Sequence, residues 1–163
     1  MAEIVTIGVI AAKTKIDNPW VDHRWSVGGV LTEVPPIAPY MLLRSDGETD
    51  FIFAGTTELP LHAAETAHYR DNLAGQLKIW VVLRPHEVHG IELIAATIDP
   101  YEGEAFAETI GDIVEPVPMP EIIEAKLRQF YETNHVEREF FKRKRKEFDK
   151  DALGRRGIVR GET

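Results

Sequence analysis

The chain of 163 residues contains no cysteine. It therefore has no disulfide framework, no thiolate nucleophile, and no thiolate ligands for a zinc or iron–sulfur centre. A metal or cofactor would have to be held by oxygen atoms, imidazole nitrogens or the backbone. This absence excludes more chemistry than any other property of the composition.

Long apolar runs and nucleotide-binding motifs are also missing. No stretch approaches the roughly 18 consecutive apolar residues of a membrane helix. The sequence has no Walker loop, no dinucleotide fingerprint and no nucleophile elbow. Its first residues are typical of a strand and lack the basic region of a signal peptide. We therefore expect a soluble cytoplasmic protein with no membrane contact, and the sequence predicts no catalytic residue, no cofactor and no metal ligand.

Charge is distributed unevenly along the chain, whose net charge is −8. Residues 1–125 carry 7 basic and 20 acidic side chains, a balance of −13, whereas residues 126–163 carry 12 basic and 7 acidic ones, a balance of +5. An acidic body repels nucleic acid and anionic membranes at long range. The two ends are expected to meet different surfaces, and nucleic acid is a disfavoured partner.

The hydrophobic pattern predicts strands in the first half of the chain and helices toward its end. Asp46-Gly47 between apolar runs predicts a hairpin, and Gly28-Gly29 predicts either a bulge or a close approach of another backbone segment. Asp99-Pro100 predicts a helix start, with the aspartate as N-cap. The expected strands cover residues 4–12, 25–31, 40–44, 50–54, 79–83 and 91–98.

The expected helices cover residues 61–73 and 101–109, with two more near the end of the chain. Residues 114–120, with three prolines, are expected to form an extended arm that leads into the first of these, and residues 133–135 to end it. The fold class is therefore α+β, with an antiparallel sheet of about six strands, helices packed on one face and a C-terminal helical arm. We expect a single domain, in which residues 1–133 form an acidic α+β part that includes the first C-terminal helix, and residues 134–163 form a basic helical tail that frays at its end.

Two groups of residues are candidates for protein interaction. Trp20 and Trp25 flank the entrance to the second strand, where large aromatics either anchor a partner or cap the edge of a core. In the tail, a run of five cations follows two phenylalanines, and this combination of apolar anchor and charge favours docking to a protein. The alternative is a solvated helix face. The tail candidates are Phe140, Phe141, Arg143, Lys144 and Arg145.

The histidines are the candidates for a catalytic or metal-binding role, the alternative to protein binding. His86 and His89 are three residues apart, but a helical zinc motif needs a spacing of four, and Pro85 and Gly90 place this pair in a turn. On the helix expected over residues 61–73, His62, Glu65, His68 and Asp71 form a polar row that could transfer protons if it lined a pocket. A solvated face explains the row equally well.

Motifs along most of residues 5–146 resemble an uncharacterised bacterial family, domain of unknown function 3305. They are Asn-Pro-Trp at 18–20 with Trp25, Ala-Gly-Thr at 54–56 before Leu-Pro-Leu-His at 59–62, Glu-Thr at 65–66 before Tyr69 and Asn-Leu at 72–73, Trp-Val-Val-Leu-Arg at 80–84, Pro-Tyr-Glu at 100–102, Val-Glu-Pro-Val-Pro-Met-Pro at 114–120 and Phe-Lys-Arg-Lys-Arg at 141–145.

The resemblance implies no established activity. It does imply a genomic neighbourhood of molybdenum-dependent formate dehydrogenase subunits and maturation factors. Together with the missing catalytic motifs, it leads us to expect a non-catalytic accessory protein that binds another protein, such as a formate dehydrogenase subunit or maturation factor; a homodimer is compatible with the sequence. The alternative is a small-molecule or metal-binding enzyme that uses His62, His68 or the His86/His89 pair.

Overall fold

The structure is a computed structural model that describes residues 2–135. Within this range the strands are β1 (Ala2–Lys15), β2 (His23–Leu31), β3 (Leu42–Ser45), β4 (Thr49–His62), β5 (Lys78–His86), β6 (Gly90–Thr97) and β7 (Ile113–Pro118). The helices are the short η1 (Ala63–Glu65), α1 (Thr66–Ala74), α2 (Pro100–Phe106) and a last helix that begins at residue 121 and continues to residue 135. No helix in this part of the chain has the length and apolar character needed to cross a bilayer.

The strands form two antiparallel sheets, of order β2-β1-β4-β3 and β6-β5-β7. The α+β class and the antiparallel pairing are confirmed, but the single sheet of about six strands is wrong. The additional strand is β7, which lies in the segment expected to be an extended arm. Pro116 and Pro118 lack the N–H group that a central strand needs, yet both are tolerated because β7 is an edge strand with a free outer side.

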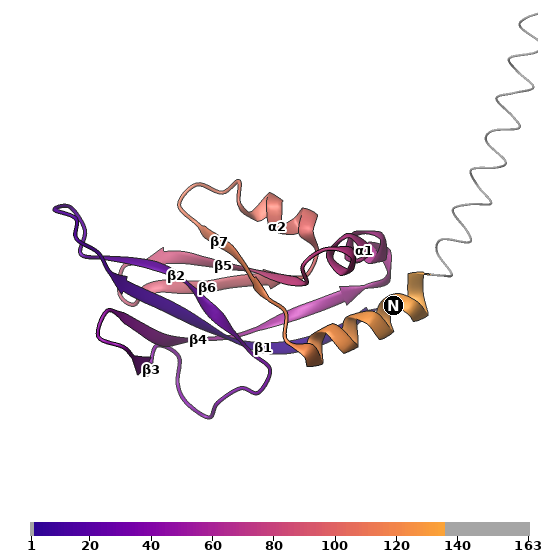
Figure 1. Ribbon diagram of the computed structural model, residues 1–163, viewed down its shortest axis with the longest axis horizontal. Helices are drawn as coiled ribbons and strands as arrows, with labels where there is room; N and C mark the ends of the chain where they lie inside the picture. Colours follow the sequence, from indigo (N-terminus) through magenta and orange to yellow (C-terminus); the bar gives the residue numbers. More distant parts are fainter. Residues whose placement is uncertain (1, 136–163) are drawn as a thin grey trace, which may run out of the picture.

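The two sheets pack face to face around one core (Figure 1). Strand β4 lies near β6 and β2 near β7, where the Val27 N–H donates a 2.8 Å hydrogen bond to Glu115 Oε1. Alternate residues of the central strands point inward, as they must in a two-layer β structure. The inward residues include Ile7 and Val9 of β1 and Val81 and Leu83 of β5, all fully buried.

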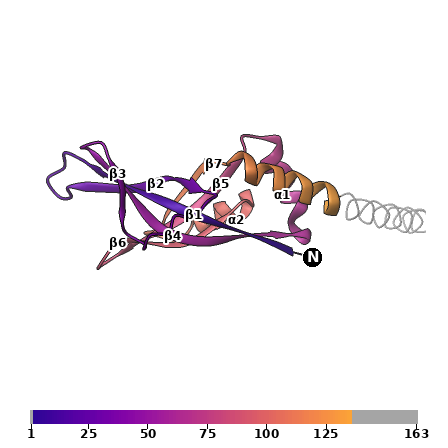
Figure 2. The same cartoon turned by 90° about the horizontal axis from the view of Figure 1, so that it is seen from below.

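The inner faces of the two sheets cover each other, so the helices do not all lie on one face of a sheet. The prediction of helices packed on one face is therefore wrong. Helix α2 covers the outer face of β5 and β6. The helix at 121–135 instead closes the end of the core with Ile123, Leu127 and Phe130. Figures 1 and 2 show this helix and α1 together at the end of the molecule opposite β3.

The boundaries of three helices differ from those expected, and α2 ends at Phe106, three residues before the expected end. Leu61 and His62 belong to β4, so α1 begins only at Thr66, after η1. The helix at 121–135 continues through the residues 133–135 that were expected to end it. Asn134 is accommodated there because its side-chain amide donates a 2.9 Å hydrogen bond to the Phe130 carbonyl one turn earlier.

The turn and cap predictions are confirmed. Gly47 has a φ of 95° in the β3–β4 hairpin, and the pairing of β1 with β2 skips one residue at Gly28, which forms the bulge. Asp99 caps α2 through hydrogen bonds from the N–H groups of Tyr101 and Glu102. Such local features depend on neighbouring residues alone, so they can be predicted from short stretches of sequence.

Asn72 attaches α1 to the second sheet. Its side-chain nitrogen donates to the carbonyl oxygens of Lys78 (2.9 Å) and Ile98 (2.8 Å), and its Oδ1 accepts from the Lys78 N–H (3.0 Å). The residue is buried on the inner side of the helix. One side chain therefore joins α1 to the start of β5 and to the residue that follows β6.

We predict that Asn72→Ala lowers the free energy of unfolding by about 3 kcal/mol, because it leaves buried backbone groups without partners. Urea denaturation measures the loss. Asn134→Ala is the matched control: it removes one hydrogen bond within a helix and should lower stability by less than about 1 kcal/mol. Equal effects of the two variants would contradict the role given to Asn72.

Gly103 is the contact point between α2 and the outer face of the second sheet. A Cβ at this position would lie 2.5 Å from Trp80 Cγ. The indole therefore occupies the space that a side chain would need, and the helix backbone rests directly on the ring.

We predict that Gly103→Ala destabilises the fold by about 2 kcal/mol, since the added methyl group must displace either the helix or the indole. Differential scanning fluorimetry and near-UV circular dichroism of Trp80 report the change. Gly75→Ala serves as the control, because a Cβ at that position would lie 3.6 Å from the Asp71 carbonyl oxygen, an ordinary contact distance. A melting temperature unchanged by Gly103→Ala would show that α2 is not seated on Trp80.

Candidate functional site

Exposed apolar side chains gather on the segment that leads into β3 and includes its first two residues, residues 34–43, which we name the edge segment. All residues of β3 are exposed, and Leu42 retains 58% of its accessible surface. Val34 and Met41 are also exposed. Strand β3 lies at the outer edge of its sheet, so its free side offers unpaired backbone groups beside these side chains.

Tyr40 orients the edge segment. It has a φ of 74°, an uncommon conformation for a residue other than glycine. Its ring stacks on His89 with the centroids 3.9 Å apart, and its N–H donates to the Phe53 carbonyl. The Met41 carbonyl accepts a 2.9 Å hydrogen bond from the Phe53 N–H. These contacts hold the backbone against β4 and the β5–β6 turn, so Met41 and Leu42 face solvent.

The two tryptophans predicted as interaction residues lie in different environments. Trp25 packs against the core, and its indole lies below the Lys13 ammonium group at 5.6 Å. Trp20 is 88% exposed in the β1–β2 loop, where Asn18 Oδ1 accepts a 2.7 Å hydrogen bond from its N–H. The loop geometry thus presents the Trp20 ring to solvent, and Trp25 contributes to the fold.

The tail candidates Phe140, Phe141, Arg143, Lys144 and Arg145 lie outside the described residues, as does most of the predicted tail. Their role stays a prediction that depends on composition and charge.

His86 is the last residue of β5 and His89 lies in the β5–β6 turn, so the pair is located at the turn that its flanking residues predict. The His86 Nδ1 accepts hydrogen bonds from the backbone N–H groups of Val88 and His89, both at 3.2 Å. A ring nitrogen that accepts hydrogen bonds carries no proton, and the Nδ1 of His86 is engaged by these two backbone N–H groups. The His86 and His89 rings are 5.2 Å apart and stack together with Tyr40. The pair therefore builds the turn and supports the edge segment.

A different histidine meets two carboxylates. His68 of α1 places its Nδ1 at 2.8 Å from Asp99 Oδ2 and at 2.9 Å from Glu65 Oε2. Glu65 ends η1 three residues earlier and shares the helix face, whereas Asp99 lies 31 residues later at the start of α2. We name these three residues the acidic triad. It lies near the surface, with the His68 side chain 40% exposed.

Tyr101 and Asp71 hold the two helices of the acidic triad together. The Tyr101 hydroxyl donates to the Asp71 carboxylate, and this hydrogen bond raises the pKa of Tyr101 above its usual value. The Tyr101 ring lies 4.6 Å from the His68 ring. Part of the polar row predicted for this helix is thus brought together: Glu65 and His68 converge, Asp71 serves as a support, and His62 remains on β4 outside the group.

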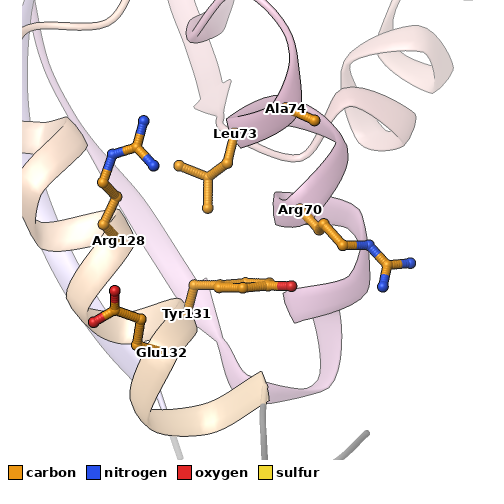
Figure 3. A pocket seen from close by; sticks show the side chains of 6 residues that line it. All are labelled: Arg70, Leu73, Ala74, Arg128, Tyr131 and Glu132. Atoms are coloured by element: carbon orange, nitrogen blue, oxygen red, sulfur yellow. The ribbon is translucent and has the colours of Figure 1, made fainter.

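The hollows nearest these residues are shallow grooves. One, of about 320 Å³, lies between α1 and the last helix (Figure 3) and is lined by Arg70, Leu73, Ala74, Arg128, Tyr131 and Glu132. Another, of about 430 Å³, has Asp71, Trp80 and Tyr101 among its lining residues. Neither groove is lined by a histidine.

Comparison with known proteins yields a family but no characterised relative. No curated protein and no solved structure gives a significant match to the chain. The family model described as "Protein of unknown function (DUF3305)" matches residues 6–145, which include both the edge segment and the acidic triad. The match covers far more than half of the sequence, so the chain belongs to the DUF3305 family.

Proposed function

We propose that this protein is an accessory factor that binds another protein through the edge segment. The observation that carries the proposal is the row of exposed apolar side chains on an open strand edge. Natural proteins usually protect such edges, because unpaired backbone groups beside apolar side chains readily accept another strand. An edge that keeps Met41 and Leu42 exposed is suited to an extended, apolar segment of a partner.

The chemistry of the edge segment favours a protein over other partners. An added strand would take main-chain hydrogen bonds from β3 and fill the spaces around alternate side chains, which is a common mode of peptide recognition. Nucleic acid is disfavoured, because residues 1–125 carry 20 acidic and only 7 basic side chains. Trp20 offers a second apolar contact in the β1–β2 loop.

The basic tail adds a steering charge to this proposal. Arg143, Lys144 and Arg145 attract an acidic partner surface over several ångströms, and Phe140 and Phe141 supply apolar anchors. In this arrangement the edge segment provides most of the binding energy, and the tail accelerates encounter.

For the partner we propose a subunit or a maturation factor of a molybdenum-dependent formate dehydrogenase, met in the cytoplasm. The support is the genomic neighbourhood that the family resemblance implies. A protein that displays a binding edge is suited to holding a client during assembly.

Substitutions in the edge segment test the proposal. We predict that Leu42→Asp and Met41→Asp each weaken partner binding at least tenfold, about 1.4 kcal/mol, because a charge replaces a buried apolar contact. Tagged full-length variants are used in pull-downs from the native cell, and the affinity of each recovered protein is then measured by biolayer interferometry.

Ile110→Asp is the matched control, since Ile110 is 99% exposed in the loop between α2 and β7 and should leave binding unchanged. Binding that survives both edge variants would contradict the proposal. So would a change of oligomeric state in Leu42→Asp with partner binding intact, because the edge would then join copies of this chain.

A second prediction concerns the tail. Reversing the charges at Arg143, Lys144 and Arg145 to glutamate should reduce the association rate about tenfold at low salt, with little change in the dissociation rate. Stopped-flow measurements at two ionic strengths separate these effects. An association rate that is independent of both salt and charge reversal would exclude steering by the tail.

A further inference from the structure

The acidic triad combines the ligand types that bind first-row transition metals. One oxygen atom each from Glu65 and Asp99 and the Nδ1 of His68 all lie within 4.8 Å of one another. Carboxylates and water suit Mn²⁺, whereas an imidazole also suits Fe²⁺ and Zn²⁺. We propose that Glu65, His68 and Asp99 bind one divalent first-row transition cation.

The distances favour a six-coordinate ion. Ligands on one face of an octahedron, with bonds of about 2.1 Å, are separated by about 3.0 Å. The His68 Nδ1 lies 2.8 Å from Asp99 Oδ2 and 2.9 Å from Glu65 Oε2, close to that separation. A cation can therefore be accommodated between these atoms after small side-chain rotations.

Asp99 is already oriented for this role. Its Oδ1 accepts the Tyr101 N–H at 2.9 Å as the cap of α2, which leaves Oδ2 directed at His68. The Asp99 N–H donates to Thr97 Oγ1, and only 12% of the Asp99 side chain is exposed. A carboxylate held in this way has little freedom to lose when it binds a metal.

The surrounding charge also favours a cation. Asp71 and Glu104 add acidic groups near Tyr101, and Glu102 adds one near Tyr69. Among the described residues, His68 is the basic partner that the structure gives to Glu65 and Asp99. The carboxylates around the triad therefore outnumber its basic groups, and a divalent ion would offset their charge.

The triad lies near the surface, so the ion would keep several positions for water. Glu65 is 39% exposed and His68 is 40% exposed on their side chains. Three protein ligands with open positions are typical of exchangeable or catalytic sites, whereas closed sites have structural roles. The bound ion would also connect η1 and α1 to the start of α2.

Titration of the full-length protein tests the site. The chain is purified without a histidine tag and stripped of metal, then titrated calorimetrically with Mn²⁺ and with Zn²⁺. We expect one ion per chain, with Zn²⁺ bound more tightly than Mn²⁺ as the usual affinity order requires. Each of Glu65→Gln, His68→Ala and Asp99→Asn should weaken binding at least tenfold. Asp99→Asn retains the helix cap, because asparagine caps as well as aspartate.

The double variant His86→Ala/His89→Ala is the control and should bind within twofold of the native chain. Far-UV circular dichroism checks that each variant is folded. No saturable binding by the native chain up to about 1 mM would overturn the proposal. Binding that survives all three triad variants, or that disappears in the control, would overturn it equally. No partner is needed, so either result leaves the edge segment proposal to its own test.

Discussion

The hydrogen bonds of Asn72 determine how the helical end of this molecule is arranged. This side chain holds the Lys78 backbone at the start of β5 and the Ile98 carbonyl directly before Asp99. It therefore sets the separation between α1, which carries His68, and the residue that caps α2. The acidic triad is close in space because one buried amide joins α1 to the start of β5 and to the Ile98 carbonyl, 26 residues later in the chain. A shift of α1 by a single turn, 5.4 Å in an α-helix, would separate His68 from Asp99.

Features that depend on neighbouring residues could be predicted from the sequence. Asp46-Gly47, Gly28 and Asp99-Pro100 each act through a local backbone conformation, and each lies where its pattern indicates. The division into two sheets could not be predicted, because it depends on which distant strands pair. Strand β7 was not predicted because its prolines argue against a strand. The rule that excludes proline from central strands does not apply at a free edge. Pro60 is tolerated in β4 for a related reason, because β3 is too short to pair along its whole length.

The site was predictable only in part, for the same reason. Helical spacing placed Glu65 and His68 on one face, and the turn residues around His86 and His89 correctly removed that pair from a helix. Asp99 could be recognised as a cap, but its second carboxylate oxygen reaches His68 only through tertiary packing. Trp20 is exposed, whereas Trp25 packs against the core, although Trp20 lies just before β2 and Trp25 lies near its start. No periodicity distinguishes an exposed apolar strand at an edge from a buried one, so the edge segment required the structure.

The contact between Gly103 and Trp80 has a consequence for relatives of this chain. A side chain at position 103 would occupy the space that the Trp80 indole fills, so neither residue can change alone without a rearrangement of α2. Homologues that carry alanine or serine at the position of Gly103 should carry a smaller residue in place of Trp80. We therefore expect substitutions at these two positions to be coupled, and such covariation would mark how far the packing of α2 on Trp80 extends through the family.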